Sequence, residues 1–413
     1  MENNLDHDNY TEEELKGLIT GVEDEEVEEI QPFDPEKISI DTKPVTMDTC
    51  LRRLEQNTII LNPDFQRNEV WTHEKKCRLI ESLILKIPLP MFYVSSDEDG
   101  NFYVVDGLQR LSTIRSFVLG DEYLKTKDAS LKGNGFRLGS LEFWGLQYNK
   151  LNFKELPINI QNRIQETGFT FTIINPGTPE EVKRNIFKRI NTGGEPLTLQ
   201  EIRHALYIGQ STKLLLKLSL KKEFLDATDY SVKSNRMMDR EIILRCLSFT
   251  IRSFQKYPRD NDMDGFLSDT MRIINLVHND KLISNSDKSF LDKANDYDPI
   301  VNKLEQLEMR FTVAMKRAKD IFGEHAFRKS YPGKRRTPIN KGLFEVWGNL
   351  LGRLSEKEFD NLKINKKKFI NSHTELLNDE NFIIVISRDS QKFSSVKTRY
   401  EKLNDLLNQF IYD

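Results

Sequence analysis

The turn Asp106–Arg110, with the sequence DGLQR, combines residue types suited to phosphate chemistry. The residues before it, up to Val105, are rich in aromatic and β-branched side chains and predict a strand. A helix N-terminus presents unpaired backbone N–H groups and a partial positive charge, and Arg110 would add a formal cation there. The segment therefore predicts a phosphate-binding turn between a strand and a helix. The helix itself is indicated by apolar residues at helical spacing: Leu108, Leu111, Ile114 and Val118.

A purely structural role for the same turn is equally open. Asp106 can cap the helix, and Gln109, three residues later, can complete a capping box. Asp-Gly is also typical of two-residue hairpin turns, but the residues that follow keep helical period, so we set the hairpin aside. Capping and phosphate binding are compatible with each other.

A second candidate lies in the segment PDFQRNEVW, where Gln66 and Arg67 stand between Phe65 and Trp71. An arginine held beside aromatic side chains can make bidentate contacts with phosphate or carboxylate. It can equally be the partner in a structural ion pair, and these residues alone favour that role.

The elements that must position these residues follow from hydrophobic periodicity. We expect a helix over 48–55, a strand over 58–61 and a helix that starts after Thr72. Strands over 91–95 and 101–105 form a predicted hairpin that leads into the turn. Residues 121–165 are expected to supply further strands and a connecting loop, and a strand is expected over 169–174.

Residues 179–207 carry two further site candidates. Pro179 starts a predicted helix that ends at Asn191, in a glycine-containing turn that can bind an anion or simply terminate the helix. Thr198 and Glu201 form a capping-box pattern for the next helix, which carries Arg203.

Beyond Tyr207 the sequence shows helical period with long polar faces, so we expect an all-helical domain. Its basic loop, residues 328–342, includes Lys334, Arg335 and Arg336. These cations could hold a nucleic-acid backbone, since such binding depends on phosphate neutralisation. Basic surface clusters are more often simply solvated.

Composition limits the class of protein. The 413 residues, 38% of them hydrophobic, are enough for two or three domains with real cores. A formal charge of -3 gives no overall basic field that would indicate nucleic acid. The three cysteines have no CxxC spacing, and we expect a soluble, cytoplasmic protein without a signal segment. Residues 1–36 are acidic and predict a mobile tail.

Four motifs in this order resemble one known family: PDFQRNEVW, ESLILKIPLP, YVVDGLQRLSTI and FKRINTGGEPLTLQEIR. They are similar to the N-terminal domain of GmrSD-type restriction enzymes, which carries FQR and DGQQR motifs. The resemblance implies a ParB/sulfiredoxin-like fold, nucleoside triphosphate binding and hydrolysis at the DGQQR loop, and action against foreign DNA. Carried over by position, it implies a site made of Gln66, Arg67, Asp106, Gly107, Gln109 and Arg110.

This chain departs from the family pattern in two ways. Leu108 replaces the first Gln of DGQQR, so a polar group that could orient water is missing. Many relatives continue into an HNH nuclease, which needs clustered histidines, whereas His278, His325 and His373 are far apart here. No P-loop, HExxH or GxSxG motif offers another catalytic centre.

We therefore expect an α+β protein: an acidic tail over 1–36, a ParB/sulfiredoxin-like domain with a small mixed sheet over 37–207, and a helical domain over 208–413. The expected function is NTP binding and hydrolysis with Mg²⁺ in a restriction or anti-phage system that acts on or senses foreign DNA. One alternative is a non-catalytic module that binds nucleotide or nucleic acid and recruits a nuclease partner, and a weaker one is a ParB-like DNase. Asp106, Gln109 and Arg110 are the expected catalytic residues, and Asp106 is the expected Mg²⁺ ligand. The expected phosphate-binding residues are Gln66, Arg67, Gly107, Arg110, Asn191 and Arg203, and the expected nucleic-acid contacts are Lys334, Arg335 and Arg336.

Overall fold

The structure is a computed structural model that describes residues 21–23, 39–61, 71–190, 197–278, 285–294 and 297–412. The chain divides into two compact units. The first is Ile30–Leu206, and the second is Tyr207–Asp413 together with Met1–Glu29. Each unit has its own architecture.

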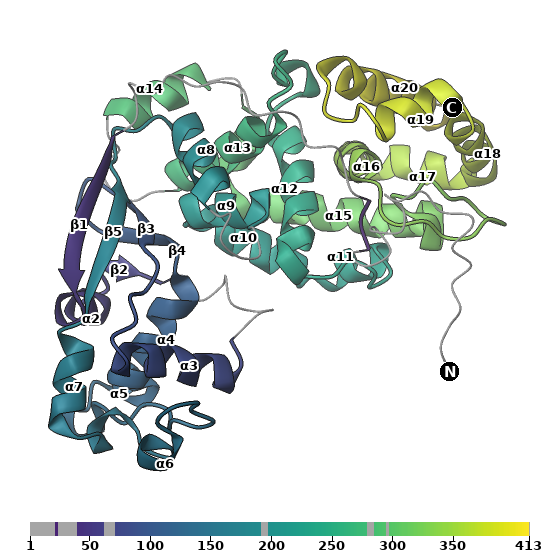
Figure 1. Cartoon of the computed structure of the whole chain (residues 1–413). Helices are drawn as coiled ribbons and strands as arrows, with labels where there is room; N and C mark the ends of the chain where they lie inside the picture. Colours follow the sequence, from purple (N-terminus) through teal and green to yellow (C-terminus); the bar gives the residue numbers. More distant parts are fainter. Residues whose placement is uncertain are drawn as a thin grey trace, which may run out of the picture. The chain divides into compact units, whose positions relative to one another are not determined.

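The first unit is built on a five-stranded mixed sheet (Figure 1). Its order is β1-β5-β3-β4-β2. The β1–β5 and β3–β4 pairs are antiparallel, whereas β3–β5 and β2–β4 are parallel. The strands are β1 (Ile40–Thr46), β2 (Ile59–Ile60), β3 (Phe92–Ser96), β4 (Phe102–Asp106) and β5 (Gly168–Ile174).

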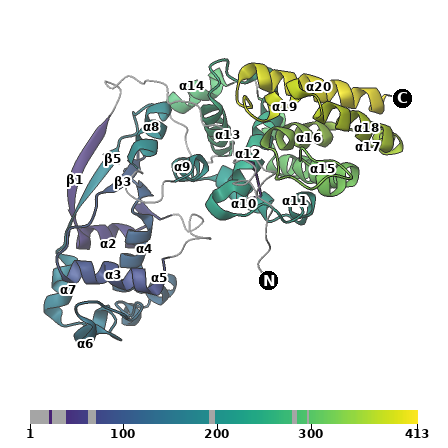
Figure 2. The ribbon, with the colours of Figure 1, turned by 45° about the vertical axis from the view of Figure 1, so that its right-hand side comes forward.

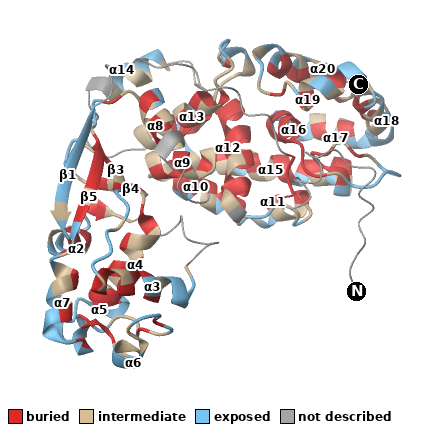
Figure 3. Ribbon diagram, in the orientation of Figure 1, coloured by how far each residue is buried: buried red, intermediate tan, exposed pale blue. Residues whose placement is uncertain are grey.

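Four of these strands were predicted, and the hairpin β3–β4 is confirmed. Strand β1 was not predicted, because it lies at the edge of the sheet and is exposed along most of its length. Asp41, Lys43 and Pro44 interrupt any alternation of apolar residues. Figure 3 shows β1 exposed beside the buried β5.

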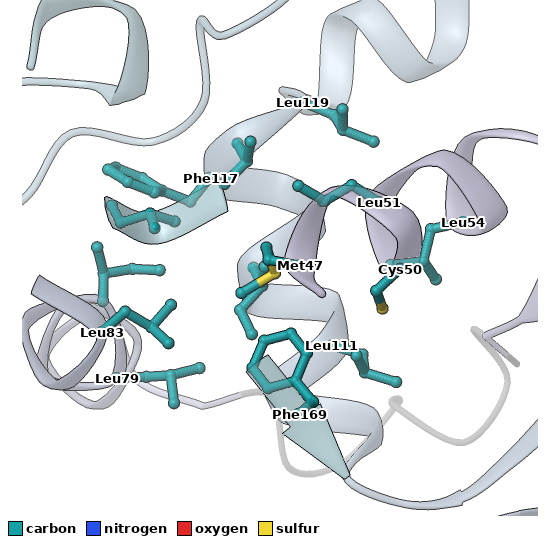
Figure 4. Close-up of a cluster of buried hydrophobic side chains, with 14 of the residues drawn as sticks. Met47, Cys50, Leu51, Leu54, Leu79, Leu83, Leu111, Phe117, Leu119 and Phe169 are labelled. Carbon is teal, nitrogen blue, oxygen red and sulfur yellow. The ribbon is translucent and has the colours of Figure 1, made fainter. Parts of the chain in front are cut away.

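Helices cover both faces of the sheet. Phe171 of β5 and Val104 of β4 point into a large core, whereas Ile174 and Val105, from the same two strands, point into a smaller one. In the large core, side chains from three helices and from β5 converge (Figure 4). The helices on that face are α2 (Met47–Glu55), α3 (His73–Ile84), α4 (Leu108–Val118) and α7 (Ile158–Gln165). The smaller core is closed by α8 (Glu180–Ile190) and α9 (Leu199–Leu206), of which α8 runs beside β5 (Figure 2).

The prediction of further strands over 121–165 is wrong. The segment forms the short helices α5 (Asp121–Thr126) and α6 (Gly145–Tyr148), then α7. Side-chain bonds to the backbone hold it in place. The buried carboxylate of Glu81 accepts three backbone N–H bonds from residues 142–144, at 2.8–3.0 Å. Such bonds leave no periodicity in the sequence, which explains the error.

Among the described residues from 207 to 412, the regular elements are helices and none is a β-strand, as predicted. A buried ion cluster joins three of these helices. Glu345 of α16 forms ion pairs with Arg245 of α12 and with Arg399 of α20. Nε of Arg399 donates to Glu345 Oε1 at 2.6 Å. Removing one partner would leave a buried charge, so the cluster fixes how these helices pack. The helices are α10 (Gln210–Ser219), α11 (Lys222–Ala227), α12 (Met238–Ile251), α13 (Met263–Val277), α14 (Asn285–Lys293), α15 (Leu304–Phe322), α16 (Lys341–Arg353), α17 (Glu356–Ile364), α18 (Lys366–Leu377), α19 (Glu380–Ile386) and α20 (Phe393–Ile411).

Residues 21–23, which fall within the predicted acidic tail, pack against the helical unit. Val22 is fully buried and forms a parallel bridge with Ile339. The Glu23 side chain accepts a hydrogen bond from Asn340 Nδ2 at 2.8 Å and pairs with Lys329 at 3.1 Å. These three residues are docked on the helical unit, and the other residues of the predicted tail lie outside the described ranges.

The α+β prediction is confirmed, and the ParB/sulfiredoxin-like assignment stays a prediction. Among the described residues, no helix has both the length and the apolar character needed to cross a membrane.

Candidate functional site

The DGLQR turn joins β4 to α4 through a left-handed glycine. Gly107 has φ 95° and is the N-cap of α4, and its carbonyl accepts from the N–H of Leu111 at 2.9 Å. A Cβ at this position would lie 2.3 Å from Cδ1 of Phe92, so only glycine fits. The strand-to-helix prediction is confirmed. The alternative that Asp106 caps the helix is wrong, because the N-cap residue is Gly107, which makes no side-chain cap hydrogen bond.

Arg110 is the best-anchored side chain of the turn. Its Nη2 donates to Asp106 Oδ2 at 3.0 Å and to the carbonyl of Met91 at 3.2 Å, and Nη1 donates to the carbonyl of Pro90. The guanidinium also lies over the ring of Phe92, 4.5 Å from its centroid. Burial lowers the pKa of Arg110, and the Asp106 carboxylate opposes that shift.

The two partners of this ion pair differ in exposure. The side chain of Arg110 is 12% exposed and that of Asp106 is 41% exposed. The guanidinium is therefore committed to protein acceptors, and the carboxylate is the group of the pair that a ligand can reach. Arg110 sets the orientation of Asp106 more than it offers a free cation to phosphate.

Leu108 and Gln109 differ in burial. Leu108 is 9% exposed and belongs to the large core between the sheet and the helices. The replacement of a Gln at this position therefore removes no polar group from the exposed side of the turn in this structure. Gln109 is half-buried in the first turn of α4.

Three predicted site residues, Gln66, Arg67 and Asn191, lie outside the described residues. Arg203 is described and is 1% exposed. Its Nε donates to Gln200 Oε1 at 3.0 Å within α9. Because α9 packs against β4, the helix that carries Arg203 and the strand that carries Asp106 share the smaller core. Such burial suits a positioning role better than direct contact with a ligand.

The predicted nucleic-acid residues lie in the other unit. Lys334, Arg335 and Arg336 are exposed on the loop before α16, and Arg336 forms an ion pair with Asp229. The loop is held by Arg328, which is 2% exposed and donates to backbone carbonyls of Glu324, Thr337 and Thr228. Part of this basic cluster is therefore structural.

Within the described ranges, Asp106 is not part of a cluster of metal-ligating side chains. Among the described residues there is no group of three His, Cys, Asp or Glu side chains placed to hold a metal ion. Magnesium is commonly bound through one or two carboxylates together with substrate phosphates. A single carboxylate such as Asp106 fits this kind of site, in which the nucleotide phosphates supply most of the other ligands.

Sequence reasoning missed Phe92. It supports Arg110, and it makes a side chain at position 107 impossible. Its position two residues after the motif ESLILKIPLP, at the start of β3, was the available signal.

Comparison with known proteins agrees with the motif order. No curated protein and no solved structure matches the chain. One family matches residues 51–208, and it is described as the GmrSD restriction endonuclease, N-terminal domain. The match contains the DGLQR turn, α3, β3 and α9. Residues 51–208 therefore match the family of GmrSD restriction endonuclease N-terminal domains.

Proposed function

We propose that the first unit binds a nucleoside triphosphate at the DGLQR turn and hydrolyses it with Mg²⁺, in a restriction system that acts on or senses foreign DNA. One observation carries this proposal: the Asp106 carboxylate is partly exposed and held by Arg110 at the start of an 11-residue helix. A helix N-terminus is a common binding place for phosphate.

The roles follow from the geometry of the turn. The first N–H groups of α4, after Gly107, would face phosphate oxygens, and Asp106 would hold Mg²⁺ or position the attacking water. Gln109 would orient the same water. Because phosphoryl transfer depends mainly on positioning and electrostatics, no covalent nucleophile is needed. Gln66 and Arg67 stay proposed partners of the phosphates, and Asn191 and Arg203 proposed supports.

A second candidate is a nucleotide-sensing module without turnover, which would recruit a separate nuclease. The observation in its favour is that Asp106 is already paired with Arg110 at 3.0 Å, so Mg²⁺ must compete with a guanidinium. DNA stays the proposed target in both cases, and the exposed Lys334 and Arg335 are its proposed contacts.

The test is phosphate release from a panel of nucleoside triphosphates with Mg²⁺, with calorimetric binding in parallel. We expect Asp106→Asn to abolish turnover and to retain nucleotide binding. The matched control is Glu74→Gln, which removes an exposed carboxylate from an i,i+4 pair on α3 of the same unit and should behave as the wild type. Binding without turnover in the wild type would select the sensing module. If the protein bound no nucleoside triphosphate, both the proposed hydrolysis and the proposed sensing module would be contradicted.

A further inference from the structure

A pocket of about 400 Å³ lies in the first unit, at the opposite end of α4 from the DGLQR turn. It is formed where the C-terminal end of α2, the last turn of α4 and α5 meet. None of its lining residues belongs to the turn. They are Leu54, Asn57, Arg115, Asp121, Leu124, Lys125 and Lys127.

Arg115 is the unusual member of this pocket. Its Nε is buried and donates no hydrogen bond within the part of the chain that the structure describes. Burial lowers the pKa of Arg115, and the carboxylate of Asp121 opposes that shift. A buried donor without an acceptor is unfavourable by about 1–3 kcal/mol, and more for a charged group. Nε itself is covered, but Arg115 as a whole is half-buried and lines the pocket, so a bound oxyanion would contact the accessible part of its side chain.

The charge around Arg115 is also unbalanced. The pocket is lined by three cationic side chains, Arg115, Lys125 and Lys127, and by one carboxylate, Asp121. Lys125 is paired with Glu122 at 2.9 Å, so the excess positive charge comes from Arg115 and Lys127. That carboxylate accepts a hydrogen bond from Ser116 Oγ at 2.9 Å, so part of its capacity is used outside the pocket. The site therefore favours a multiply charged anion.

The remaining lining adds an apolar wall and an amide. Leu54 is buried and Leu124 is half-buried, and Asn57 follows α2 in a left-handed conformation with φ 57°. A volume near 400 Å³ with both apolar and polar walls is typical of sites for small organic ligands. We propose that this pocket binds the phosphate group of a small phosphorylated molecule of about mononucleotide size, with Arg115 as the central phosphate contact.

Arg115 also has a possible structural role, because cations in the last turn of a helix interact favourably with the helix dipole. That role would affect stability alone. The proposal instead requires that removing the charge of Arg115 lower the affinity for phosphate, and that removing the charge of Asp121 raise it.

The experiment is calorimetric titration of the full chain with inorganic phosphate, pyrophosphate and a nucleoside monophosphate, at constant chloride. Arg115→Gln should weaken binding about tenfold or more, since one charge-assisted bond is lost. Asp121→Asn should strengthen binding several-fold, because a competing charge is removed, and this variant keeps the test valid if Arg115→Gln does not fold. The matched control is Arg78→Gln on α3, which is exposed and outside the pocket.

Arg115→Gln should weaken the binding of these small phosphates without abolishing phosphate release from nucleoside triphosphates, which separates the pocket from the DGLQR turn. The proposal is overturned if the wild type binds none of the three small phosphates. It is also overturned if Arg115→Gln lowers stability without changing affinity, or if Arg115 affects only the binding of duplex DNA.

Discussion

Replacing Arg110 by Met should destabilise the first unit substantially, because the guanidinium is a structural contact of the turn. The substitution keeps an unbranched side chain of similar length and removes the charge. It breaks the ion pair with Asp106, two hydrogen bonds to the carbonyls of Pro90 and Met91, and the stacking on Phe92.

The magnitude follows from burial. Hydrogen bonds from a charged group contribute about 1.5–3 kcal/mol each, but Pro90 and Met91 are both exposed, so water partly replaces each of these bonds. The ion pair is partly solvated at Asp106, so it contributes at most about 1 kcal/mol, and the cation–π contact about 0.5–1 kcal/mol. After these discounts we expect a loss of about 2–3 kcal/mol in the free energy of unfolding of the first unit.

Hydrogen exchange of the α4 amides measures this loss directly. A chain of two units need not unfold in one step, so a local probe is better than a global transition. The expected loss makes exchange by unfolding of this unit about 30-fold to 160-fold faster. Arg78→Met, which breaks only an exposed i,i+4 pair, should change exchange by less than about threefold.

If Arg110→Met exchanges like the wild type, Arg110 is not a structural contact of the turn and the reasoning from its burial is refuted. In that case its guanidinium would be available to a nucleotide. If the loss is observed, reduced nucleotide affinity in Arg110 variants must be corrected for the unfolded fraction.

Three further predictions concern other contacts of the two units. Gly107→Ala should destabilise the first unit by more than Gly100→Ala, as followed by exchange of the β3–β4 amides: both residues have positive φ, but only position 107 also collides with Phe92. Glu81→Gln should cost about 2–3 kcal/mol near neutral pH, again by amide exchange, because two or three backbone N–H groups lose a charged acceptor. Burial raises the pKa of Glu81, but these bonds outweigh it and hold the pKa below the usual 4.5. The stabilisation that the Glu81 carboxylate provides is therefore present above pH 4.5 and should disappear as the pH falls through the lowered pKa. In the helical unit, burial lowers the pKa of His373 from 6.5 to about 3. The free energy of unfolding should therefore fall as the pH drops below 6.5, by up to about 1.4 kcal/mol per pH unit. Thermal denaturation from pH 7 to 4 measures this dependence. The variant His373→Gln should flatten that slope, and an unchanged slope would show that other groups cause it.

Local sequence determined the elements around the site. The alternation in β3, β4 and β5, the glycine between strand and helix and the helical period of α4 are all present in the order of the residues, because each depends on neighbours in the chain. The same holds for the capping box at Thr198 and Glu201, which the structure confirms with bonds of 2.7 and 3.2 Å. The helical character of residues after 207 also follows from periodicity.

Only the tertiary structure decided what these side chains do. Arg110 looked like a free cation, yet its acceptors include carbonyls 19 and 20 residues earlier in the chain. Leu108 looked like a lost polar group, yet it faces the core. Glu81 fixes a loop about 60 residues away, and Val22 docks beside Ile339. Periodicity reports which face of an element is buried, but not which distant donor, acceptor or ring meets it. For that reason the DGLQR turn was predictable from the sequence, and the Arg115 pocket was not.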